Sequence, residues 1–165
     1  MNEPLQNLIE ALREELKHYG EMLALLDQQQ QWVALRQGRE LLKSVTEVDD
    51  QAEAIRVARH EREQRFRDLA RTLMLGKVDG FQQLIPSLPS ECRPLVQALV
   101  EENNQLLQRI QKRARQNYLL LSRSLELMQR FINTLIPGSC PTTHSELGLV
   151  PASALPAKGF NEGIG

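Results

Sequence analysis

The fold is decided by residues 107–135, which read LQRIQKRARQNYLLLSRSLELMQRFINTL. Apolar side chains recur in this stretch at spacings of three and four residues, the pattern of one face of a long α-helix. The spacings average about 3.5 residues, as in the seam of a coiled coil. Two successive spacings of four predict a local stutter around Ala114. The seam comprises Leu107, Ile110, Ala114, Tyr118, Leu121, Leu125, Met128, Ile132 and Leu135.

This seam belongs to a predicted helix over residues 91–136. Ser90 is the candidate N-cap, because its hydroxyl can accept a hydrogen bond from a free amide of the first turn. Pro137-Gly138 ends the helix. The helix also carries more apolar residues than one seam can bury, so we expect another element or a partner to cover part of it. Within residues 107–135, the apolar residues outside the seam are Leu119, Leu120, Leu127 and Phe131.

Two earlier segments show the same seam spacing, and they predict helices over residues 4–36 and 40–75. A tight turn is expected at Gly38, because glycine takes the left-handed conformation that ends many helices. Gly76 is expected to end the second helix. The first seam comprises Leu5, Ile9, Leu12, Leu16, Tyr19, Leu23 and Leu26. The second comprises Leu41, Val45, Val48, Ala52, Ile55, Arg59, Arg62, Phe66, Leu69 and Leu73.

A short turn makes consecutive helices antiparallel neighbours. The predicted fold is therefore all-α, an elongated antiparallel three-helix coiled-coil bundle with a long third helix. Residues 77–90 connect the second and third helices and are long enough to contain a short helical turn at residues 81–85. The bundle occupies residues 1–136. Residues 137–165 are rich in Pro and Gly, and we expect them to form a flexible, disordered tail.

The composition excludes several classes of protein. The chain has 165 residues and a net charge of -1, too balanced for the whole chain to bind nucleic acid or an acidic membrane. The N-terminus lacks the basic and apolar regions of a secretory signal, and no segment is apolar for long enough to span a membrane. Cys92 and Cys140 are then expected to be reduced thiols. The sequence predicts a cytoplasmic protein without stable membrane insertion.

No set of residues predicts catalysis. Glu15 and His18 have the Glu-x-x-His spacing of di-iron bundles, but such a site needs this motif twice and two further inward Glu residues. The other histidines do not supply the second motif, so we interpret His18 as a surface residue. No Gly-rich phosphate loop follows a strand, and the cysteines lack partners at ligand spacing. We therefore expect no enzyme activity, no cofactor and no metal.

Two stretches of the chain are rich in charged residues. The Arg-rich part of the second helix, residues 56–68, is interpreted as a solvated surface with salt bridges. The third helix carries a basic face formed by Arg109, Lys112, Arg113 and Arg115. This face fits a solvated surface that pairs with acidic residues of the other helices, and it also fits a partner-docking patch. Nucleic-acid binding is the weakest alternative, because no aromatic residues for base stacking are interleaved.

The order of these signals resembles the FlgN-type flagellar export chaperones. The first helix ends in QQQQWVALRQG at residues 28–38, and ELLK follows at residues 40–43. The long final helix contains RQNYLLLSRSL at residues 115–125. The resemblance covers about residues 5–136 and implies a cytosolic chaperone. Its implied clients are the hook-associated junction proteins, whose C-terminal helical segments it keeps from assembling prematurely. Its other implied partners are the flagellar type III export gate and the export ATPase complex.

A client helix needs an apolar helix face that the bundle leaves uncovered. We expect that face on the third helix, where the partner-binding residues are Asn117, Tyr118, Leu121, Leu125, Met128, Ile132 and Leu135. The same stripe can instead be core. Two alternatives remain open: a structural coiled coil that self-associates into a homo-oligomer, and a helical adaptor that binds nucleic acid through the basic face.

Overall fold

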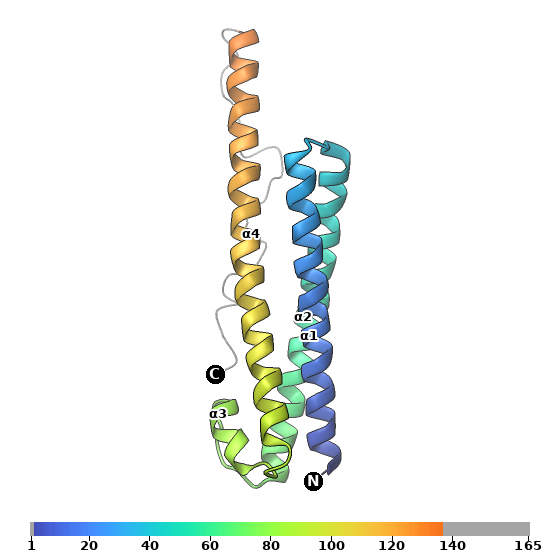
Figure 1. Cartoon of the computed structure of the whole chain (residues 1–165), viewed down its shortest axis with the longest axis vertical. Helices are drawn as coiled ribbons and strands as arrows, with labels where there is room; N and C mark the ends of the chain where they lie inside the picture. Colours follow the sequence, from blue (N-terminus) through green and yellow to red (C-terminus); the bar gives the residue numbers. More distant parts are fainter. Residues whose placement is uncertain (1, 137–165) are drawn as a thin grey trace.

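The computed structural model describes residues 2–136, and they form an all-α protein. Three long helices, α1 (Asn2–Ala34), α2 (Gly38–Thr72) and α4 (Arg93–Leu135), run along the length of the molecule (Figure 1). The connection between α2 and α4 contains the short helix α3 (Phe81–Leu84) and the 3₁₀ turn Ile85–Ser87. The described residues contain no strand, so the all-α prediction is confirmed. The predicted tail, residues 137–165, lies outside the described residues.

Helix α1 lies at the centre of the arrangement. It forms an antiparallel hairpin with α2 and runs parallel to α4 (Figure 1). The α1 backbone lies close to both α2 and α4, whereas the backbones of α2 and α4 lie farther from each other. Because α1 packs on two sides, Leu8 and Met22 are fully buried in addition to its predicted seam. A single seam per helix therefore underestimated how much of α1 is buried.

Two apolar clusters form the core, one in each half of the bundle. The lower cluster joins the start of α1, the end of α2 and the start of α4. It is closed by Phe81, Leu84 and Leu88 of the connection, all almost fully buried. Phe81 packs edge to face on Phe66 of α2, with 4.9 Å between the ring centroids. Burial of each such side chain contributes about 1.5–3 kcal/mol, which explains why α3 stays against the bundle end.

A buried ion pair separates the two clusters. Arg62 Nε lies 2.9 Å from Glu15 Oε2, and the Tyr19 hydroxyl donates a 2.7 Å hydrogen bond to Glu15 Oε1. Burial, together with the neighbouring Glu15 carboxylate, raises the pKa of Tyr19. The interpretation of residues 56–68 as wholly solvated was therefore wrong for Arg62. Its position in the predicted seam of the second helix had indicated burial, and a buried charge needs a buried partner.

A non-glycine residue takes the left-handed conformation after α1 and another does so after α2. Arg36 has φ 54°, and the amides of Arg36 and Gln37 donate to the carbonyls of Val33 and Trp32. Met74 has φ 52°, with the same pattern of hydrogen bonds after α2. Both are Schellman motifs. The predicted roles of Gly38 and Gly76 were thus wrong: Gly38 is the first residue of α2, and Met74 rather than Gly76 takes the left-handed conformation.

The start of α4 also differs from the prediction. Ser90 is not the N-cap, because α4 begins at Arg93 after Cys92, with no side-chain cap hydrogen bond. Pro94 lies in the first turn, where its missing amide hydrogen costs no hydrogen bond. The amides of Cys92 and Arg93 instead donate to the Pro89 carbonyl. A proline-nucleated turn has replaced the side-chain cap.

We expect Met74→Gly to stabilise the protein by about 1 kcal/mol, because the left-handed conformation strains any residue with a Cβ. The Met74 side chain is 93% exposed, so its removal loses little packing. Chemical denaturation measures the free energy of unfolding. Met74→Ala is the control and should give no such gain, since alanine keeps the Cβ. Equal stability of the Gly and Ala variants would contradict the strained cap.

Candidate functional site

Two buried asparagines set the position of α4 along α1. Asn103 Nδ2 donates to the Leu12 carbonyl at 3.1 Å, and Asn117 Nδ2 donates to the Leu26 carbonyl at 2.8 Å. Each pair is separated by 91 residues in sequence, so the two helices run parallel in one fixed register. The same offset places Ala34, the last residue of α1, level with Leu125 of α4. The rest of α4 extends past the end of the hairpin, as Figure 1 shows.

Asn117 belongs to a polar layer that lies next to the upper apolar cluster, which joins the second half of α1, the first half of α2 and the middle of α4. Its Nδ2 also lies 3.0 Å from Gln29 Oε1, and Gln29 Nε2 donates to Ser44 Oγ at 3.3 Å. The Ser44 hydroxyl donates in turn to the Leu41 carbonyl at 2.6 Å. One hydrogen-bonded chain therefore links α4, α1 and α2. It explains why Ser44, and not the predicted seam residue Val45, faces the core.

The prediction that Asn117 contacts a partner needs correction, because the residue is 2% exposed and its Nδ2 donates to α1. The predicted stutter is also not seen in the burial pattern. The residue after Ala114 that faces the bundle is Asn117, three positions on, rather than Tyr118. The heptad spacing therefore continues through Asn117 into Leu121. Asn103 and Asn117 lie near seam positions in the sequence, where an amide is expected to fix the register, and both are buried against α1.

Beyond Asn117, α4 is largely uncovered by the rest of the described chain. We call residues 118–136 the α4 end segment. Its rise of about 1.5 Å per residue gives it a length of about 28 Å. Of the predicted partner-binding residues, Leu121 is half-buried and the others beyond Asn117 are exposed. Its exposed large apolar residues are Tyr118, Leu119, Leu120, Leu125, Leu127, Met128, Phe131, Ile132, Leu135 and Ile136.

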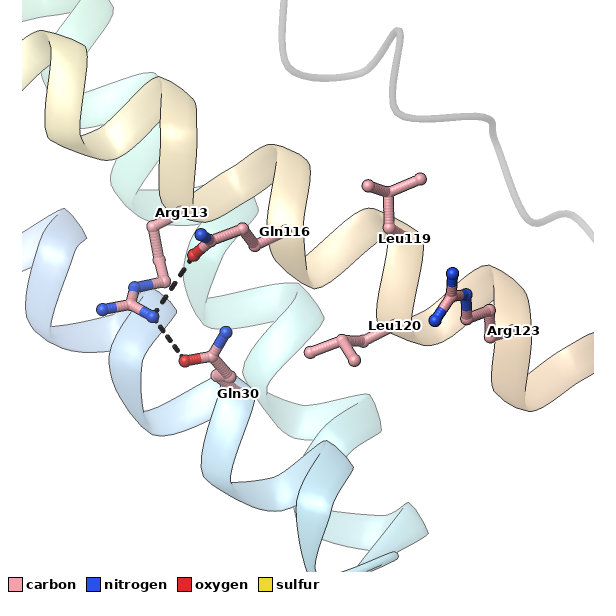
Figure 2. A pocket seen from close by; sticks show the side chains of 6 residues that line it. All are labelled: Gln30, Arg113, Gln116, Leu119, Leu120 and Arg123. Carbon is pink, nitrogen blue, oxygen red and sulfur yellow. Dashed lines mark hydrogen bonds between the residues drawn. The ribbon is translucent and has the colours of Figure 1, made fainter.

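A shallow groove of about 400 Å³ lies where the end segment leaves α1 (Figure 2). Arg113 lines the groove. It is held by Asp27, with 2.7 Å between Nε and Oδ1, and by a hydrogen bond to Gln30. Leu120 points toward Gln30 and Leu119 points away from it (Figure 2). The lining residues are Gln30, Arg113, Gln116, Leu119, Leu120 and Arg123. From the QQQQ run at residues 28–31, Gln30 lines this groove.

The remaining sequence candidates do not form a second site among residues 2–136. Glu15 points into the core and His18 lies beside Glu14 and Glu21, so the two do not converge. No group of three potential metal ligands exists among the described residues. Arg113 is paired with Asp27, which fits the interpretation of the basic face as a surface that pairs with acids of another helix. Within the same residues, no helix is long and apolar enough to span a membrane.

The double substitution Asn103→Leu and Asn117→Leu should raise stability but loosen the register. The Oδ1 atom of each amide is buried and has no hydrogen-bond partner in the described structure, so leucine removes a cost of about 1–3 kcal/mol per site. It also removes the polar contacts that make one register unique. Thermal unfolding should shift upward, and amide NMR signals of α4 should broaden or double. Gln105→Leu, at an exposed position of α4, serves as control. A less stable variant with a single set of signals would contradict this role.

The comparisons with known proteins agree with the resemblance seen in the sequence. The family model described as FlgN protein matches residues 1–145, which includes all the described helices. No curated protein and no solved structure matches the chain. Because the match covers most of the chain, the protein belongs to the FlgN family.

Proposed function

We propose that this protein is a cytosolic flagellar export chaperone that binds the C-terminal helical segments of hook-associated proteins on its α4 end segment. Membership of the FlgN family supports the general role of a flagellar export chaperone. The specific clients, and delivery to the type III export gate and its ATPase complex, are part of the proposal. The chemistry needed is binding alone, with no catalytic group or cofactor.

The observation that carries the proposal is the exposed apolar surface of the end segment. Monomeric soluble proteins rarely expose contiguous apolar patches of this kind unless they bind something there. Full burial of a leucine or phenylalanine side chain contributes about 1.5–3 kcal/mol. Several such side chains together offset the cost of ordering a client helix. An amphipathic client helix would thus gain a partner here for its own apolar face.

This mode of binding also accounts for protection against assembly. An amphipathic helix that assembles with other copies must use its apolar face for that contact. While the face is packed on α4, it is not accessible to a second client molecule. The chaperone would then release an unassembled client at the export gate.

Self-association through the same surface is the second candidate function. The observation that favours it is that an uncovered apolar helix can also pair with its own copy. Sedimentation distinguishes the two: a tight homodimer without affinity for hook-associated proteins would favour a structural coiled coil.

Replacing both Leu125 and Met128 by Asp should weaken capture of hook-associated proteins about 100-fold or more. Each substitution removes apolar contact area and places a charge in the interface, at about 1.4 kcal/mol per tenfold loss. Both side chains are exposed in the free protein, at 40% and 61%, so folding should be retained. Copurification and calorimetric titration measure binding, and circular dichroism checks the fold.

The matched control is Asn133→Asp, which adds the same charge on the polar face of the end segment and keeps the acceptor for Gln129. It should bind like the wild-type protein. Unchanged binding by the Leu125 and Met128 variant would exclude the end segment as the client site. Global unfolding of that variant would show instead that these residues belong to the core.

A further inference from the structure

We propose that the end segment is completed by two client helices, which together with α4 form a three-helix bundle that continues the chaperone's own. The inference rests on the proposed function and specifies the form of the client at that site. A single amphipathic helix would leave half of the apolar surface uncovered.

The first argument is the width of the apolar face. At about 100° per residue, the residues that α4 buries between Val96 and Asn117 lie within an arc of about 80°. Within this arc α4 packs mainly on α1, since the backbones of α2 and α4 lie farther from each other. In the end segment, the apolar residues from Leu127 around to Tyr118 span about 180°. A face this wide is typical of a helix packed between two others rather than against one.

The second argument is that this face divides into two seams. The inner seam continues the arc with which α4 faces the bundle and comprises Leu121, Leu125, Met128, Ile132 and Leu135. The outer seam is turned by about 100° from it and comprises Leu120, Leu127 and Phe131. A coiled-coil partner covers one seam. With only the inner seam covered, Leu127 and Phe131, 62% and 64% exposed in the free chain, would have no apolar partner from that helix.

The third argument is continuity with the existing bundle. Helix α1 ends and α2 begins at the hairpin turn, residues 35–37, while α4 continues past it (Figure 1). Among the described residues, no other helix lies beside this part of α4. One client helix would continue the line of α1 along the inner seam, and the second would lie beside it on the outer seam. The groove beside Leu120 marks the start of the outer position (Figure 2).

The test compares single substitutions on the two seams. Leu127→Asp and Phe131→Asp, on the outer seam, should each weaken binding of a purified full-length hook-associated protein at least tenfold. Asn133→Asp is the control, since Asn133 is exposed and lies outside the apolar arc. It should change the affinity less than twofold. Titration calorimetry measures the affinities, and circular dichroism checks that each variant stays helical.

The possible results separate this inference from the proposed function. Wild-type binding by the outer-seam variants, together with loss of binding by Leu125→Asp and Met128→Asp, would overturn the two-helix inference and retain the client site. Wild-type binding by all variants would overturn both. Equal losses for Asn133→Asp would show that the outer seam is not specifically involved and would overturn the inference. A free chain that sediments as a dimer, and becomes monomeric with Leu127→Asp, would assign the outer seam to a second copy and also overturn it.

Discussion

The structure depends on the hydrogen bonds from Asn103 and Asn117 to backbone carbonyls of α1. Two amides separated by fourteen residues on α4 meet two carbonyls separated by fourteen residues on α1. Apolar seams alone would tolerate a shift by one heptad, because leucine packs on leucine in either register. A shifted helix would separate Asn117 from the Gln29 side chain, its partner in the polar layer. The register decides how far α4 extends past the hairpin, and so which apolar residues stay uncovered.

The distribution of polar and apolar residues follows from this constraint. The interior contains a buried ion pair between Glu15 and Arg62 and the polar layer at Gln29, where partners must be unique. The α4 end segment has the opposite character, with leucines exposed to water. Interior polarity costs stability and exposed apolar surface costs solubility. Both costs are understandable in a protein that must hold one helix rigidly while it offers part of that helix to a partner.

Much of this could be predicted from the sequence. The long helices, the all-α class and the surplus of apolar residues around Leu125 follow from local periodicity, which a helix expresses wherever it packs. The pattern placed Asn117 near the seam but did not give its partner or that of Arg62, because both partners lie on a second helix. The caps at Arg36 and Met74 were missed because local propensity assigns their left-handed conformation to glycine, whereas here non-glycine residues complete the Schellman hydrogen bonds. The sequence indicated the uncovered region, but its extent required the register.

Hydrogen–deuterium exchange along α4, with and without a purified hook-associated protein, tests the central claim most directly. The amides of residues 97–117 pack in the bundle and should exchange slowly in both samples. The amides of the end segment have little tertiary support from the other described residues, so in the free chain they should exchange quickly and become protected on binding. An end segment already protected in the free chain, or one unchanged by the client, would contradict the account.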